Sequence, residues 1–257
     1  MLGKMNDAPL ILSLETATPG GSIFLGRGST QLAARQGDPQ VSQSSSLLSD
    51  INDSLEEAAI SLREVELFVC AIGPGSFTGL RIGISTLKAL AASLRRPCIG
   101  IPTLQAIAHA AGPSSATVAL LPAGRGEVFA EMFFVAEETI TELDAAAHLS
   151  PQKLVERYGA IKNLRWAGSG AYLQRDFLNT YAQERGIVFA DGTSESVFLN
   201  GATDDNTWLL APKETNLAKH VAALALRLFQ TGKTQSPYSL SAIYVRPSDA
   251  ELKEQCR

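Results

Sequence analysis

The sequence predicts an α/β protein of two lobes, each a mixed sheet flanked by helices. Two observations predict this class. Short apolar segments alternate with amphipathic segments of helical period along most of the chain. In addition, 257 residues with 45% hydrophobic content are enough for two separate cores. The turn-rich stretch at 112–115 is the expected boundary, so we expect lobes at 1–112 and 113–257.

The first lobe is expected to open with an antiparallel meander. Short apolar runs separated by glycines predict its strands at 10–14, 22–25 and 31–35. Apolar residues at intervals of three and four then predict helices, and continuous apolar runs predict buried strands between them. The expected helices are 44–60, 78–94 and 103–111, and the expected strands are 67–72 and 98–101.

The second lobe has weaker signals. Apolar runs predict paired strands at 116–121 and 128–135, and a third strand at 164–167. Helices are expected at 150–158 and, most strongly, at 213–230, which we expect to be the last helix and to pack back on the first lobe. The polar segment 191–206 is interpreted as a surface excursion. No internal repeat is apparent.

The string Gly73-Pro-Gly-Ser-Phe-Thr-Gly-Leu-Arg-Ile-Gly83 joins a buried strand to an amphipathic helix. Glycines at a helix start let a phosphate or another backbone approach the N–H groups. Neither the Walker spacing nor the dinucleotide-binding spacing is present. A tight connection capped by Ser76 or Thr78 is the plainer alternative. Phe77 in this string indicates docking against another domain or subunit.

This string and the residues that follow it resemble the TsaB family of bacterial tRNA threonylcarbamoyladenosine biosynthesis proteins. The segments 11–17, 126–129 and 243–247 add support. The resemblance implies an actin-like and sugar-kinase-like fold related to the transferase TsaD. It also implies a cytoplasmic, noncatalytic scaffold that supports threonylcarbamoylation of the tRNA adenosine next to the anticodon, with no enzymatic activity of its own.

The resemblance further implies pairing through the two first-lobe helices, either with a TsaD-type transferase or, when the chain is alone, with a second copy. A TsaE-type ATPase is expected in the complex, and tRNA only through the complex. No cofactor is required by this chain; ATP and Mg²⁺ belong to the complex. The expected partner-binding residues combine an apolar stripe with the loop that precedes the second helix: Leu47, Leu48, Ile51, Leu55, Phe77, Thr78 and Arg81.

Catalytic motifs are not found. The transferase relative uses a His-x-x-x-His metal pair, and the matching positions here are Thr103 and Ile107. Ser76 and Ser169 lack the glycines of a hydrolase elbow. The three histidines are scattered and are interpreted as ordinary. The chain also departs from the family at 122–125, where Pro-Ala-Gly-Arg stands in place of Asp-Ala-Arg.

An alternative from another class is a small nucleotide-dependent kinase or ATPase. It would use Glu15 and Thr16 of the first hairpin together with Gly73 and Gly75. Autonomous tRNA binding is a third alternative, and composition speaks against it. The chain has 22 basic and 26 acidic residues, a formal charge of −4, whereas affinity for a polyanion rests on several cation–phosphate contacts. Binding of tRNA by a local basic patch is left as an open alternative.

The three cysteines, Cys70, Cys98 and Cys256, lack metal-binding spacing and favour reduced thiols in a cytoplasmic protein. The short apolar run near the N-terminus is far below the roughly 20 residues of a membrane span, so no membrane association is expected.

Overall fold

A computed structural model describes residues 8–192 and 206–245. The chain divides into two compact units. Unit 1 comprises the residues up to Ala106 and Thr215–Ile243, and unit 2 comprises Ile107–Glu214 and the residues from Tyr244 onward. The division thus differs from a single cut at residue 112, because the last long helix belongs to unit 1. Most of the expected excursion at 191–206 lies outside the described residues, as does Cys256.

Unit 1 is built on a five-stranded mixed sheet with the order β3-β2-β1-β4-β5. The expected meander forms its antiparallel half, and the buried strands extend it in parallel. The strands are β1 (Leu10–Glu15), β2 (Ser22–Arg27), β3 (Thr30–Gln36), β4 (Leu67–Ala71) and β5 (Cys98–Ile101).

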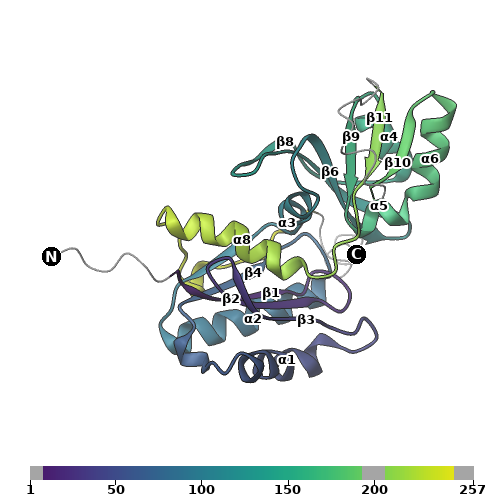
Figure 1. Ribbon diagram of the computed structural model, residues 1–257. Helices are drawn as coiled ribbons and strands as arrows, with labels where there is room; N and C mark the ends of the chain where they lie inside the picture. Colours follow the sequence, from purple (N-terminus) through teal and green to yellow (C-terminus); the bar gives the residue numbers. More distant parts are fainter. Residues whose placement is uncertain (1–7, 193–205, 246–257) are drawn as a thin grey trace. The chain divides into compact units, whose positions relative to one another are not determined.

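Helices cover both faces of this sheet (Figure 1). On one face lie α1 (Gln43–Glu57) and α2 (Phe77–Leu94), which pack on strands β1 to β4. On the other lies α8 (Leu217–Gln230), where the Ser13 hydroxyl donates to the Ala218 carbonyl at 2.8 Å. Short 3₁₀ turns form η1 (Leu62–Glu64) and η2 (Pro237–Ser239). Strand β1 therefore has both faces buried, which explains its nearly continuous apolar sequence.

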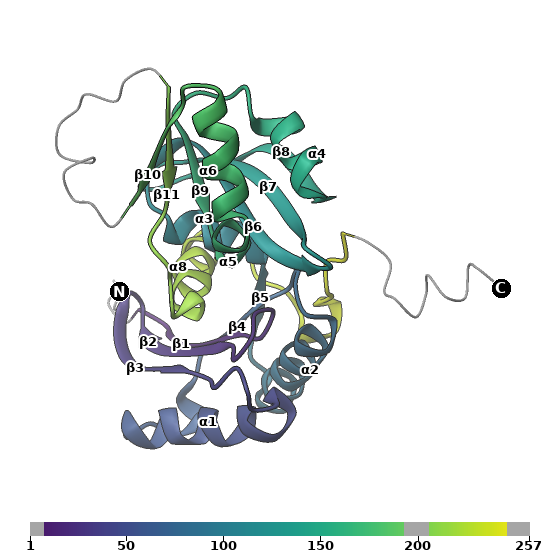
Figure 2. The same ribbon diagram turned by 90° about the vertical axis from the view of Figure 1, so that its right-hand side faces the viewer.

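Unit 2 is built on a six-stranded sheet with the order β10-β11-β9-β6-β7-β8. Its strands are β6 (Ser114–Gly124), β7 (Glu127–Val135), β8 (Ile140–Leu149), β9 (Leu164–Ala167), β10 (Val188–Asp191) and β11 (Thr207–Leu210). Its helices include α4 (Pro151–Tyr158), α5 (Ser169–Leu173) and α6 (Arg175–Glu184), drawn in Figure 2. The helix α3 (Thr103–Ala110) leads from unit 1 into unit 2.

Aromatic rings fill the core of unit 2. Trp166 and Trp208 are completely buried and meet edge to face, with ring centroids 5.1 Å apart. Tyr181 stacks on Trp208, whose indole N–H donates to the Ile161 carbonyl at 3.0 Å. The Trp208 N–H is thus satisfied within the core, whereas the buried Trp166 N–H has no hydrogen-bond partner among the described residues.

The two sheets share one plan. Each begins with three consecutive antiparallel strands, which are β1 to β3 in unit 1 and β6 to β8 in unit 2. Two further strands then extend the sheet in parallel beside the first of the three: β4 and β5 in unit 1, and β9 and β11 in unit 2. The structure therefore contains a repeat that the sequence does not display. None of the described helices is long and apolar enough to cross a bilayer.

Candidate partner-docking site

The glycines of the string at 73–83 are explained by close contacts within unit 1. A Cβ atom on Gly75 would lie 2.6 Å from Ala17, and one on Gly79 or Gly83 would overlap Thr16. Three glycines spaced four residues apart therefore let the first turns of α2 lie directly on the turn after β1. On the side where a Cβ would stand, Gly75 is therefore approached by another backbone segment of unit 1, and its contact with a phosphate stays a prediction.

Gly73 is enclosed in the same way. Its N–H donates to the Thr103 hydroxyl at 3.1 Å, and its carbonyl accepts from the Thr103 N–H at 2.8 Å. A Cβ atom on Gly73 would overlap the carbonyl oxygen of Ile243. The Ile243 N–H in turn donates to the Ile72 carbonyl at 2.7 Å. The position that matches a metal-binding histidine of the transferase thus holds a threonine that fastens this loop.

Ser76 caps α2, and the helix begins at Phe77. The Ser76 hydroxyl accepts from the Gly79 N–H at 3.2 Å, while its own N–H donates to the Ala17 carbonyl at 2.8 Å. Of the two expected caps, the structure therefore uses Ser76 and leaves Thr78 exposed. The guanidinium of Arg81 lies 3.8 Å from the centre of the half-buried Phe77 ring. This pair stiffens the surface of the first turn.

Glu15 and Thr16 are buried, with 1% and 3% of their surface exposed. The Glu15 carboxylate accepts from the Thr18 N–H at 2.8 Å and from its hydroxyl at 2.6 Å. Burial raises the pKa of Glu15, and the bonds from Thr18 oppose that rise. Glu15 is therefore a satisfied residue that closes the β1–β2 turn.

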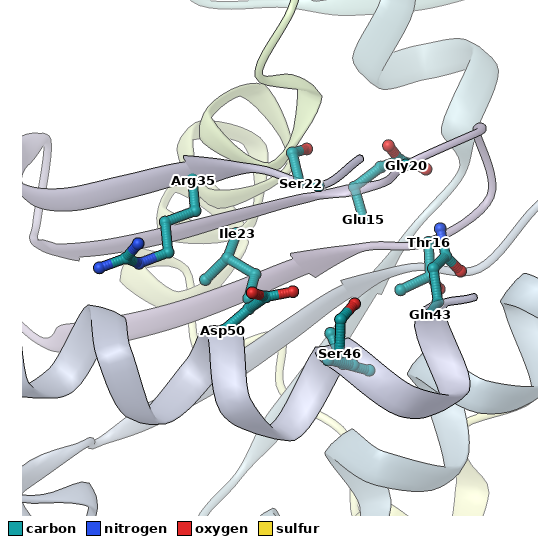
Figure 3. A pocket seen from close by; sticks show the side chains of 11 residues that line it. Glu15, Thr16, Gly20, Ser22, Ile23, Arg35, Gln43, Ser46 and Asp50 are labelled. Carbon is teal, nitrogen blue, oxygen red and sulfur yellow. The ribbon is translucent and has the colours of Figure 1, made fainter. Parts of the chain in front are cut away.

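The cavity that Glu15 and Thr16 line is small. Figure 3 shows Gln43, Ser46 and Asp50 of α1 facing the strands across it. Its volume is about 10 Å³, room for about one water molecule. This cavity does not fit a nucleotide with Mg²⁺, so the kinase or ATPase alternative gains no support from it.

The expected apolar stripe on α1 is divided between two environments. Leu47, Ile51 and Leu55 are only 6%, 4% and 7% exposed and lie in the core of unit 1. Leu48 is 65% exposed. The assignment of the three buried residues to a partner surface therefore needs correction: the sheet beneath α1 takes them, and Leu48 alone of the four faces outward.

An open groove of about 290 Å³ lies where α1 and α2 begin. Val41, 45% exposed, and Ile82 contribute its apolar side chains. The other lining residues are small or polar and none is charged: Thr18, Pro19, Gly20, Pro39, Ser42, Gln43, Ser76, Thr78 and Gly79. We define the docking face as this groove together with Leu48 and Arg81. Val41, Ile82 and the two prolines were not predicted from the sequence, since they come from loops and from the edge of a helix.

The two positions that the resemblance matches to a metal pair hold no metal ligand. Thr103 and Ile107 are buried, and within residues 8–192 and 206–245 no three His, Cys, Asp or Glu side chains gather as a metal site. The His148 ring pairs with Glu127 at 2.8 Å in unit 2. The docking face offers apolar contact and hydroxyl groups, which suit a protein partner.

Among solved structures, YeaZ from Pseudomonas aeruginosa shares this fold, with a TM-score of 0.68 and 21% identity over 92% of this chain and 99% of that chain. The fold defines an α/β protein built of two units of similar plan, each a mixed sheet with helices packed on it, and the expected α/β class is confirmed.

The model of the family TsaD, tRNA N6-adenosine threonylcarbamoyltransferase, matches residues 41–230. The chain therefore belongs to the TsaD family. A curated relative that matches nearly end to end is the tRNA threonylcarbamoyladenosine biosynthesis protein TsaB of Escherichia coli (strain K12), 28% identical over 95% of this chain and 97% of its own length. A transferase of Protochlamydia amoebophila (strain UWE25) is 43% identical over 24% of this chain and 18% of its own length. The resemblance to TsaB is confirmed.

Proposed function

We propose that this chain is a noncatalytic subunit in the synthesis of threonylcarbamoyladenosine in tRNA, and that it binds a TsaD-type transferase through the docking face. Family membership and the near end-to-end match to a TsaB protein support the pathway. A second copy occupies the face when the transferase is absent. A TsaE-type ATPase, with its ATP and Mg²⁺, joins the complex in the cytoplasm.

The single observation that supports docking is the exposure of Leu48 on α1, the helix whose first residue, Gln43, lines the uncharged groove. A leucine that is 65% exposed on a helix otherwise buried through Leu47, Ile51 and Leu55 is available to a partner. Burying such a side chain contributes about 1.5–3 kcal/mol. Because interface energy is concentrated in a few buried residues, Leu48 is the expected anchor.

The noncatalytic role is supported by what the described site residues do. The glycines of the string contact the protein itself, Glu15 and Thr16 are buried, and a threonine stands at the metal-ligand position. The chemistry therefore belongs to the transferase, whose active form this chain stabilises.

Capture of purified TsaD-type transferase tests this proposal. Leu48→Glu should reduce capture at least tenfold, because a carboxylate in an apolar interface loses its hydration. Leu143→Glu makes the same change at a residue 47% exposed in unit 2 and should leave capture unchanged. Equal capture by a folded Leu48→Glu protein would contradict the proposed face. Leu47 and Ile51 are unsuitable for this test, since glutamate there would disrupt the core.

A further inference from the structure

Four cations gather at one edge of the sheet of unit 1. Strands β1, β4 and β5 are parallel, so their first residues lie at the same edge. Arg63 precedes β4, Arg95 and Arg96 precede β5, and Lys233 lies two residues before Gln235, which bridges to Cys98 at the start of β5. We call these four residues the basic edge.

Contacts hold the basic edge together. The Arg96 guanidinium donates to the Arg63 carbonyl at 3.4 Å, which joins the segments before β4 and β5. Cys98 and Gln235 exchange backbone hydrogen bonds at 3.1 and 2.8 Å, which places the Lys233 segment alongside. Arg95 ends α2 in the left-handed conformation, with φ of 54°, and is exposed. The four side chains thus come from fixed backbone.

No acid neutralises this group. In the part of the chain that the structure describes, none of the four cations forms an ion pair. The nearby Glu66 already pairs with Arg27 at 3.8 Å. Glu64 accepts from the Ser61 N–H at 2.8 Å and keeps its negative charge, so the four cations together with Glu64 still leave a net positive group. A net-acidic protein therefore has a local positive field at this edge, which attracts a polyanion.

We propose that the basic edge binds the phosphate backbone of an RNA, as a contact separate from the docking face. Three of its four cations are arginines, whose planar guanidinium matches a phosphate with two hydrogen bonds. An anionic membrane is the other polyanion to consider. Membrane-binding surfaces add large apolar side chains to their cations, and no large apolar residue within 60–66, 93–98 or 231–236 is exposed.

That this RNA is a tRNA rests on the proposed function. The inference that the basic edge binds a polyanion rests on the charge and geometry of its four side chains. A handful of phosphate contacts gives weak binding that depends steeply on salt. The expected role is therefore a second anchor, which holds the substrate while the transferase acts, and binding by this chain alone is measurable at low ionic strength.

The test is fluorescence anisotropy of a labelled tRNA transcript titrated with the full chain at several NaCl concentrations. The edge variant is Arg63→Gln with Arg95→Gln and Lys233→Gln, which leaves Arg96 and its bond to the Arg63 carbonyl in place. Its matched control removes three exposed lysines of unit 2, by Lys153→Gln, Lys162→Gln and Lys213→Gln. Both variants change the net charge equally.

The edge variant should lose about tenfold or more in affinity near 50 mM NaCl, and the slope of log K against log salt should fall by about 2–3. The control should stay within about twofold of wild type at the same salt. Equal loss in both variants, or no binding of RNA by wild type, overturns the proposal. The proposal is also overturned if wild type binds phosphatidylserine vesicles and the edge variant does not, while the two proteins bind RNA equally well. Transferase capture by the edge variant, expected to be intact, keeps this outcome distinct from the Leu48 test.

Discussion

Glu131 has the least favourable surroundings of the acidic side chains described in unit 2. It is 8% exposed on β7 and, among the described residues, has no hydrogen bond or ion pair. Burial raises its pKa to about 7, and the charges of Glu142 and Asp144 on β8 add to that effect. A carboxyl in such a site is easier to keep protonated than ionised.

This pKa predicts how stability depends on pH. The folded chain holds the Glu131 proton up to about pH 7, whereas the unfolded chain releases it near 4.5, so stability falls as the pH rises between these values. Glu131→Gln should therefore increase the free energy of unfolding by about 1–2 kcal/mol at pH 8 and change it little at pH 4. Urea unfolding at the two pH values measures this. An equal effect at both would show that ionisation is not the cause.

At the scale of elements, α2 packs closely on the turn after β1. This contact depends on Gly75, Gly79 and Gly83, which face Thr16 and Ala17. A glycine inside a helix is less favourable than alanine by about 1 kcal/mol, so Gly79 and Gly83 lower the helix propensity of α2. Close packing of α2 is what compensates for them.

Gly83→Ala should therefore destabilise the protein by about 1–3 kcal/mol, because the new methyl group overlaps the Thr16 side chain. Thr16→Ala in the same chain removes the overlapping atoms and should recover part of the loss. Urea unfolding of the two single variants and the double variant measures the coupling. Ser85→Ala, exposed on the same helix, is the control and should change stability by less than about 0.5 kcal/mol. A stabilising Gly83→Ala would contradict the packing described.

Elements with strong periodicity could be predicted from the sequence. The strands at 98–101 and 164–167 match β5 and β9, and the helix expected at 78–94 begins one residue earlier. The strand β8 was missed because it is an edge strand whose sequence, with acids and three alanines, lacks alternation. Helix α5 and strands β10 and β11 were missed too, being short, and α6 was missed because its sequence is largely polar. The last helix begins at Leu217, four residues later than expected, because Asn216 caps it by accepting from Lys219 at 3.1 Å.

The candidate site could be predicted only in part, because its contacts join residues that are far apart in the sequence. The glycine string stands out in the sequence, but its contacts with Thr16 and Ile243 are distant along the chain and no local pattern reveals them. Likewise, helical spacing groups Leu47 with Leu48, and only the position of the sheet decides which of the two is buried. The basic edge combines three separate segments, so it too required the fold.

At the scale of the whole molecule, unit 1 is assembled from two segments that are separated in the sequence by residues 107–214. The helix α8 covers the sheet face that α1 and α2 leave uncovered, and the Ala218 N–H donates to the Ser22 hydroxyl at 3.0 Å. Asn216 adds bonds to the carbonyls of Ile23 and Arg35 at 3.1 and 3.2 Å. A lobe ending at residue 112 would lack this layer.

A fragment of residues 8–112 should therefore show no cooperative unfolding, because one face of its apolar sheet would be in water. Residues 8–106 joined through a flexible linker to 215–243 should fold, since this fragment has both layers of helices. Circular dichroism during urea unfolding distinguishes the two. Cooperative unfolding of the shorter fragment would show that α8 is dispensable to unit 1.

The split composition of unit 1 has a consequence for biosynthesis. A ribosome making about 5–20 residues per second needs about 5–20 s to translate the intervening segment 107–214. During that interval the nascent first half waits with one face of its sheet uncovered, whereas every described strand of the unit 2 sheet is made by residue 210, before α8. The unit 2 sheet is thus positioned to form first, and chaperones that shield the waiting strands would act before α8 is translated.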